Sequence, residues 1–161
     1  MPRRRGTVES VAEPARDENH HAPSLIYIVG RLNQGITREM RAVLSQWDLS
    51  VQEYTSLSVL ELRPGLSNAQ LARRALVTPQ SMLEILAKLE SRGLVQRDDD
   101  PEHGRVILNR LSQDGQRLLE TAAPEVEALQ ARIFAGLTDT QRKSVTAALA
   151  AAMNGLSKHV R

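Results

Sequence analysis

The sequence predicts a mainly α-helical (α+β) fold with a small β-hairpin wing, in which a winged helix-turn-helix is joined to a helical dimerisation region. Three observations predict this fold class. Two helical segments are separated by only a few residues around positions 76–78, and two β-favouring runs follow them. Long amphipathic helical patterns flank this segment on both sides. A helix pair followed by a hairpin is the order of a winged helix-turn-helix.

The composition limits the class of protein. The 161 residues suffice for a buried core, and an aromatic content of 2% means that this core must be aliphatic. The absence of cysteine excludes disulfides, a thiolate zinc site and a cysteine redox switch, and four histidines leave little material for a metal site. With no signal sequence and no apolar span, we expect a cytoplasmic protein without membrane contact. A net charge of +2 permits a nucleic-acid partner without demanding one.

The chain begins with a polar tail and then a long helix. Residues 1–22 hold four arginines, four acidic residues and no apolar period, which predicts a disordered N-terminal tail. The arginines at positions 3–5 either add a salt-sensitive phosphate contact or belong to an inert leader balanced by its own acids. From Ser24 onward, apolar residues three and four apart predict a helix that ends near Trp47.

Four later helices are announced by N-terminal capping chemistry, in which a side-chain oxygen accepts a hydrogen bond from an unpaired backbone N–H. The capping residues are Ser50 with Glu53, Ser67 with Gln70, Thr78 followed by Pro79, and Thr138 with Gln141. The second and third predict helices from Ser67 to about Leu76 and from about Pro79 to Arg92. The fourth predicts a last helix from about Asp139 to Gly155.

The hairpin and the helix after it complete the pattern. Gly93 ends the second helix of the pair, and residues 94–97 and 106–111 are predicted strands joined by a polar turn. A long helical pattern follows Ser112 and ends at Gly136. We therefore expect a DNA-binding domain at 50–111 and a dimerisation region at 23–49 and 112–161. The apolar stripes of the flanking helices are expected to pack on each other and on a second copy of the chain.

A dense group of motifs lies between residues 71 and 115. It includes LESRGLVQR at 89–97, Asp100-Pro101, Arg105 and LSQDG at 111–115. With these motifs, the chain from Ser24 to about Leu156 resembles the MarR family of winged-helix transcription regulators. The resemblance implies a homodimer whose first and last two helices interlock and whose two winged domains bind double-stranded DNA at an imperfect palindrome. It further implies a repressor that is relieved by a small aromatic or anionic inducer.

Two stretches depart from the pattern of that family. Many relatives carry Asp-x-Arg in the wing, often with a second arginine in the middle, whereas this chain has His103, Gly104 and Arg105. Relatives often have Thr-Arg in the middle of the recognition helix, whereas this chain has Leu83 and Glu84. Both departures lower the positive charge of the expected DNA-binding surface.

The recognition helix is expected to enter the major groove by its first two turns. Gln80 can pair with adenine, Ser81 suits a phosphate or a base, and Glu84 can accept from the N4 amine of cytosine. The alternative is a merely solvated polar face. The candidate DNA-binding residues are Ser67, Asn68, Arg73, Arg74, Thr78, Pro79, Gln80, Ser81, Glu84, Lys88, Arg97, His103, Gly104 and Arg105.

Several of these candidates have a second interpretation. Ser67 is equally explained as a helix cap, and Lys88, like Arg92, either neutralises a phosphate or is a surface residue. Arg105 contacts the minor groove or a phosphate, or else it pairs with the aspartates at 98–100. Those aspartates are interpreted as a solvated turn rather than a metal site.

An inducer crevice and two other function classes complete the expectations. Tyr27, Arg31, Trp47 and Tyr54 can line a ligand crevice, although packing or surface roles explain them as well. The sequence holds no phosphate loop, nucleophile elbow or His-x-x-x-His pair, so we expect neither an enzyme nor a cofactor. The alternative function is a helical dimer that binds a partner protein, which the balanced charge of residues 50–111 supports.

Overall fold

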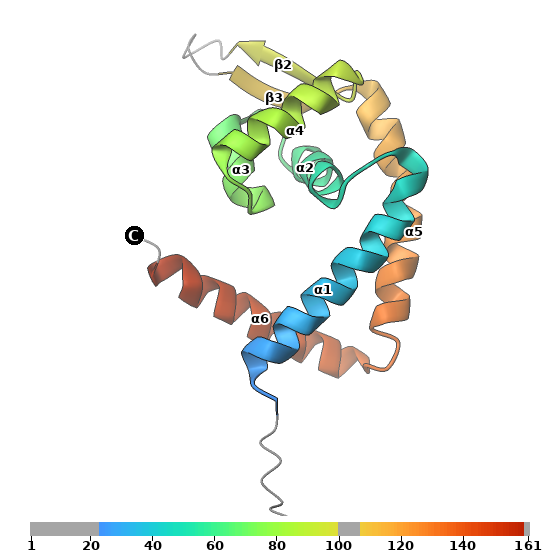
Figure 1. The fold of residues 1–161 in the computed structure, drawn as a ribbon, viewed down its shortest axis with the longest axis vertical. Coiled ribbons are helices and arrows are strands. Elements are labelled where there is room, and N and C mark those ends of the chain that lie inside the picture. Colours follow the sequence, from blue (N-terminus) through green and yellow to red (C-terminus); the bar gives the residue numbers. More distant parts are fainter. Residues whose placement is uncertain (1–22, 100–106, 160–161) are drawn as a thin grey trace, which may run out of the picture.

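The computed structural model describes residues 23–99 and 107–159, so the predicted disordered tail at 1–22 lies outside the described residues. Most of the described chain is helical, as expected (Figure 1). The helices are α1 (Leu25–Leu44), the 3₁₀ turn η1 (Ser45–Trp47), α2 (Val51–Leu62), α3 (Asn68–Ala75), α4 (Pro79–Ser91), α5 (Gln113–Ile133) and α6 (Asp139–His159). The strands are β1 (Leu66–Ser67), β2 (Val95–Asp99) and β3 (Ile107–Leu111).

The elements form one lobe from which α1, α5 and α6 extend (Figure 1). Helices α2, α3 and α4 pack together beside the sheet, while α1 and α5 run along each other away from this lobe. Helix α6 leaves the far end of α5 in a new direction. The predicted order of helix pair, hairpin and flanking helices is therefore confirmed.

All four predicted helix starts are confirmed by their hydrogen bonds. In each capping box the hydroxyl accepts from the backbone N–H three residues on, and the Glu or Gln side chain accepts from the N–H of the capping residue. For the Ser50 box these two distances are 3.1 Å and 2.6 Å. Thr78 caps α4 through the N–H of Ser81 at 3.0 Å, with Pro79 at the first helical position.

Some helix ends differ from the predictions. Helix α1 ends at Leu44, and the apolar pattern continues to Trp47 through η1, which keeps that side chain half-buried. Helix α5 ends at Ile133, three residues before Gly136, whereas α6 continues past Gly155 to His159. Glycine costs a helix only about 1 kcal/mol, so a lone glycine does not have to end it.

The sheet has three strands rather than the predicted two. Its order is β1-β3-β2, with antiparallel pairing throughout. The two-residue β1 is too short to show an alternating pattern in the sequence. It is held instead by buried Asn109 of β3, whose side-chain amide donates to the backbone carbonyl of Leu66 at 2.8 Å and whose backbone carbonyl accepts from the N–H of Gly65 at 3.0 Å.

The core is aliphatic, as the composition predicted. Side chains from α2, α3 and α4 meet at its centre, and Leu44 of α1 and Leu119 of α5 extend it toward the flanking helices. The fully buried large apolar side chains of the lobe are Leu57, Leu60, Leu71, Met82, Leu86 and Leu89. This continuous core fixes α4 relative to the rest of the lobe.

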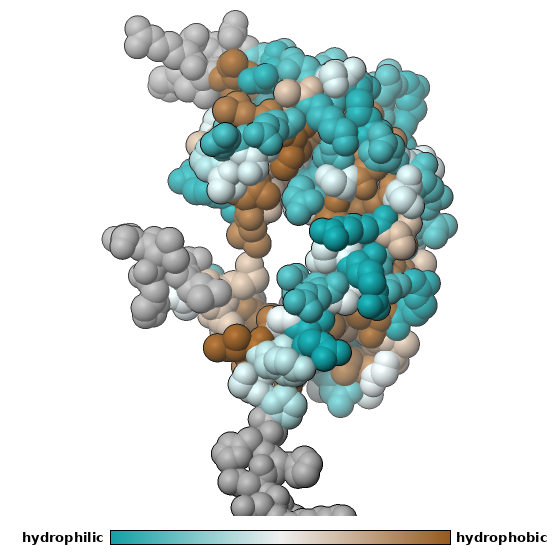
Figure 2. Space-filling view, in the orientation of Figure 1, coloured by the Kyte–Doolittle hydropathy of each residue, from teal (hydrophilic) through white to brown (hydrophobic). Residues whose placement is uncertain are grey.

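The flanking helices leave apolar surface uncovered. The first two turns of α1 and one face of α6 expose large apolar side chains (Figure 2). These are Leu25, Ile26, Ile28, Val29 and Leu32 on α1, and Val145, Leu149 and Met153 on α6. Contiguous apolar surface of this kind marks an interaction site in soluble proteins.

Candidate nucleic-acid interface

Helix α4 is the element that the sequence predicts to enter DNA, and its sides are clearly divided. Met82, Leu86 and Leu89 are fully buried on one side. Gln80 and Glu84 are exposed on the other, four residues apart and hence on the same face. The first two turns of α4 therefore present polar side chains outward, as predicted.

The start of α4 is fixed by short hydrogen bonds. The hydroxyls of Thr78 and Ser81 are 2.8 Å apart, so the Ser81 side chain, which is only half-exposed, is already engaged in the cap. The side-chain amide of Asn68 donates to the carbonyl of Pro79 at 3.1 Å and thereby joins α3 to α4. Ser67 is the cap of α3. Of these four candidate DNA-binding side chains, Ser67, Thr78 and Ser81 thus also form helix caps, and Asn68 joins the two helices.

The end of α4 is joined to α2 by an ion pair. The ammonium of Lys88 lies 2.9 Å from the carboxylate of Glu53, whose side chain is only 3% exposed. Burial raises the pKa of Glu53, but the hydrogen bonds from Ser50 and the pairing with Lys88 outweigh it and hold the pKa below its ordinary value. Lys88 therefore has a defined partner within the chain, and its head group stays half-exposed.

Arg92 has a role that the sequence did not indicate. Its guanidinium donates to the carbonyls of Asp48 and Trp47 at 2.6 Å and 2.8 Å, and so joins the residue after α4 to the junction between α1 and α2. Both carbonyls lie where η1 ends, and the carbonyls at a helix end lack partners within the helix. The sequence suggested a phosphate contact or a surface position for Arg92. Neither suggestion includes these bonds to the carbonyls of Asp48 and Trp47.

The basic residues of α3 stay exposed. Arg73 and Arg74 line a shallow surface depression of about 310 Å³ together with Gln70. Within the described part of the chain, no ion pair holds either arginine, so both guanidinium groups are available to an anion such as a phosphate.

In the wing, β2 and β3 present two arginines that are each near an acid. Arg97 of β2 lies 3.2 Å from Glu90 of α4, so the strand is joined to the recognition helix. Arg110 of β3 lies 3.7 Å from Asp98. The sequence did not single out Arg110, because only strand pairing reveals its position opposite β2. The candidates His103, Gly104 and Arg105 lie outside the described residues.

The four inducer candidates fall into two separate pairs within one chain. Arg31 donates to the hydroxyl of Tyr27 at 3.1 Å and lies 5.9 Å from the centre of its ring, on the exposed part of α1. Trp47 and Tyr54 instead pack against the core. Leu44 lies seventeen positions after Tyr27 along α1, which at 1.5 Å per residue is roughly 25 Å. One chain alone does not bring the four together.

Tyr54 is the more sheltered of the two tyrosines. Burial raises the pKa of its phenol, and the neighbouring Glu61 and Glu127 carboxylates raise it further, against a lowering by the Ser58 hydroxyl. The Tyr54 hydroxyl therefore remains protonated near neutral pH and can donate a hydrogen bond.

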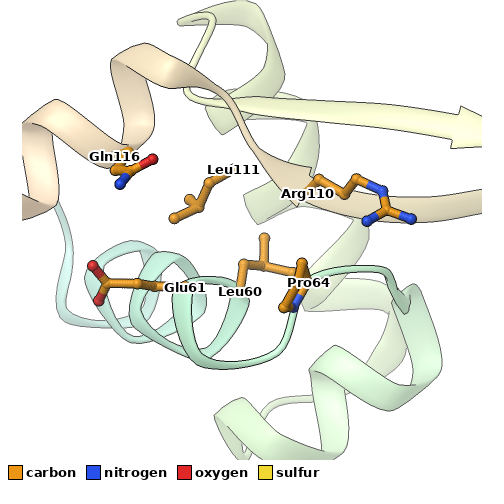
Figure 3. A pocket seen from close by; sticks show the side chains of 6 residues that line it. All are labelled: Leu60, Glu61, Pro64, Arg110, Leu111 and Gln116. Carbon is orange, nitrogen blue, oxygen red and sulfur yellow. The ribbon is translucent and has the colours of Figure 1, made fainter.

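A second depression lies where α2, β3 and α5 meet, and the sequence did not predict it. It has a volume of about 270 Å³, and its lining residues are Leu60, Glu61, Pro64, Arg110, Leu111 and Gln116 (Figure 3). Leu60 and Leu111 face each other across it, while the charged ends of Glu61 and Arg110 point to opposite sides.

Within the described residues, the structure shows neither a group of metal ligands nor a membrane-spanning helix. Within residues 23–99 and 107–159, no group of three or more His, Asp or Glu side chains is placed to hold a metal ion. No helix in the same ranges is long and apolar enough to cross a membrane.

A capped helix pair, an outward polar face on its second helix and a three-stranded wing define a winged helix-turn-helix protein. Comparison with known proteins specifies which kind. The model of the MarR family matches residues 47–106. The HTH-type transcriptional repressor Rv2887 of Mycobacterium tuberculosis is 38% identical over 117 residues, which cover 73% of this chain and 84% of the relative. The chain belongs to the MarR family.

Solved structures of that relative agree with this assignment. The structure of the Mycobacterium tuberculosis MarR family protein Rv2887 in complex with DNA matches with a TM-score of 0.67 at 34% identity, covering 81% of this chain and 98% of the other. The structure of the same protein in complex with salicylic acid matches with a TM-score of 0.67 at 36% identity, covering 82% of this chain and 98% of the other. The relative thus binds both DNA and a small aromatic acid.

Proposed function

We propose that this protein is a homodimeric, sequence-specific DNA-binding transcriptional repressor whose DNA binding is relieved by a small molecule. The observation that carries the proposal is the exposed face of α4, which presents Gln80 and Glu84 outward on a helix fixed by caps, core and ion pair. Side chains of this kind on a rigid helix suit the edges of base pairs in the major groove. The repressor name and the DNA complex of the relative support this function.

We propose further that residues 50–111 form the DNA-binding domain and that residues 23–49 and 112–161 form the dimerisation region. The exposed apolar side chains of α1 and α6 support this division, because packing against a second copy of the chain would bury them. A two-fold axis between two winged domains matches an imperfect palindrome with half-sites roughly 10 bp apart.

The proposed inducer is a small aromatic or anionic molecule. The salicylic acid complex of the relative supports this chemistry. Tyr27 and Arg31 supply a ring and a cation, while Trp47 and Tyr54 supply a ring and a hydrogen-bond donor. Because the pairs are far apart in one chain, the proposal requires either that only one pair binds or that two chains contribute.

We propose no catalytic activity for this protein and, since the proposed partner is DNA, a cytoplasmic location.

The proposed function is tested by measuring assembly and DNA selection on the full chain. Sedimentation is expected to give a dimer at micromolar concentration, and selection from random duplexes is expected to enrich an imperfect palindrome. A stable monomer would contradict the dimer. Failure to enrich any duplex would contradict DNA recognition and would favour binding to a partner protein.

Replacing Gln80 tests base recognition directly. If Gln80 pairs with a base edge, Gln80→Ala weakens binding to the selected operator by about 1 to 3 kcal/mol and leaves binding to scrambled duplex nearly unchanged. Titration of both duplexes at several salt concentrations measures this. Gln52→Ala, which truncates an exposed glutamine on α2, is the matched control. An equal loss on both duplexes would show that Gln80 only contacts the backbone.

A further inference from the structure

Leu83 is an exposed aliphatic side chain in the middle of the recognition helix. It is 49% exposed, whereas Leu86 and Leu89 of the same helix are fully buried. An aliphatic side chain left in water gains no stability from its position, and burying a leucine is worth about 1.5 to 3 kcal/mol. The structure of one chain gives Leu83 no folding role that would explain a leucine there.

The neighbours of Leu83 define the surface it belongs to. Gln80, Glu84 and Ala87 lie three before, one after and four after Leu83, and all are exposed. Leu83 and Ala87 are therefore adjacent on the helix surface, and they form a small apolar spot beside the two polar side chains. The residue seven after Leu83 is Glu90, which pairs with Arg97 of β2. Leu83 thus lies on the side of α4 that faces the wing.

The charge around Leu83 indicates which part of a DNA duplex this spot fits. Glu84 repels phosphate, and leucine has no group that can hydrogen-bond to one. Base edges in the major groove carry one apolar group, the C5-methyl of thymine, and apolar side chains contact it. An aliphatic spot beside a glutamine and a glutamate therefore matches a thymine methyl next to polar base edges.

We infer that Leu83 is a specificity-determining residue that contacts the methyl group of a thymine in each half-site of the operator. The inference rests on the proposed function, since it requires that α4 enters the major groove. It goes further by naming the base and the chemical group that this position recognises. The contact adds preference for thymine through burial of the methyl group, without any hydrogen bond.

Uracil substitution tests the inference, because uracil differs from thymine only by lacking the methyl group. After an operator has been selected with the full chain, each thymine is replaced by uracil in turn. We expect one position per half-site at which uracil weakens binding of the unchanged protein about fourfold, the value for one buried methyl-sized group. Replacing it in both half-sites should weaken binding about 15-fold.

The protein side of the test uses Leu83→Ala and Leu83→Met. The alanine variant is expected to bind the thymine and uracil operators equally well, whereas methionine keeps an apolar contact and retains most of the preference. Leu62→Ala truncates a leucine of α2 that is 80% exposed and should keep the full preference. Circular dichroism and sedimentation verify that each variant folds and assembles like the unchanged protein.

Each remaining outcome overturns the inference. An operator at which no uracil weakens binding overturns it while leaving the proposed function intact. If Leu83→Ala keeps the sensitivity to uracil, another residue contacts the methyl group, and the inference fails while the proposed function stands. The inference also fails if Leu83→Ala alters assembly but leaves the base preference unchanged. Failure to select any duplex overturns the proposed function, and the inference with it.

Discussion

Gly115→Ala is expected to destabilise the fold by about 3 kcal/mol or more, because position 115 has no room for a side chain. A Cβ there would collide with the backbone carbonyl oxygen of Leu94 and lie 3.3 Å from the Cδ2 of Leu111. The same carbonyl of Leu94 accepts from the N–H of Ser112 at 3.1 Å, and the Ser112 hydroxyl donates to the carbonyl of Gly93 at 2.5 Å. The clash therefore separates the start of α5 from the start of β2.

Thermal and urea unfolding measure this effect. A loss of about 3 kcal/mol corresponds to a decrease in Tm of roughly 6 to 12 °C for a chain of this size. Gly136→Ala is the matched control, since no atom lies within 4 Å of a Cβ at that position, and it should leave stability nearly unchanged. If both variants unfold like the parent, the wing does not pack against the first turn of α5 as the structure has it.

The parts of the fold that were predicted correctly are those set by local chemistry. The caps at Ser50, Ser67, Thr78 and Thr138 involve residues three apart in the chain, so the sequence alone specifies their hydrogen bonds. The helix pair and the β2–β3 hairpin follow from these starts and from short-range apolar patterns. The helices begin where the caps place them, whereas their ends depend on packing and were predicted less well.

The parts that were missed depend on contacts between residues far apart in the sequence. Strand β1 exists because Asn109, 43 residues later, binds the carbonyl of Leu66. Arg92 binds carbonyls 44 and 45 residues earlier. No periodicity or spacing indicates such pairs in a single sequence.

The candidate site was predicted in part for the same reason. The exposed positions of α4 follow from its helical period, which a single sequence shows. The helical period does not reveal the ion-pair partners of Lys88 and Arg97. Glu53 meets Lys88 because α2 packs against α4, and Glu90 meets Arg97 because β2 packs against α4. The sequence therefore identified the recognition helix but not the contacts that hold it.

Glu53→Ala is expected to cost about 2 to 3 kcal/mol at pH 7, through loss of the cap of α2 and of its pairing with α4. The Glu53 carboxylate accepts from the N–H of Ser50 at 2.6 Å and lies 2.9 Å from the ammonium of Lys88. Lys88 is 52% exposed and can be rehydrated, so the cost stays below that of a fully buried pair. Urea unfolding of both proteins measures the difference.

The contribution of Glu53 is also expected to depend on pH. Its pKa in the folded protein lies below the ordinary value of 4.5, so the ionised carboxylate stabilises the fold at pH values above that ordinary value. This stabilisation is lost as the pH falls from 4.5 through the folded pKa. The more conservative Glu53→Gln keeps an acceptor for Ser50 but has no charge to titrate. Its deficit relative to the unchanged protein should therefore shrink between pH 7 and the acid limb.

The exposed Glu61 on the same helix separates this effect from general acid destabilisation. No charged partner of the described chain lies in ion-pair contact with it, so Glu61→Gln should change stability by less than about 0.5 kcal/mol. Its pH dependence should match that of the unchanged protein. A Glu53→Gln deficit that stays constant down to the acid limb would show that the charge of Glu53 does not hold α2 and α4 together. Operator binding at pH 7 should fall with the Glu53 variants and not with Glu61→Gln, because Glu53, unlike Glu61, is ion-paired with Lys88 of the recognition helix.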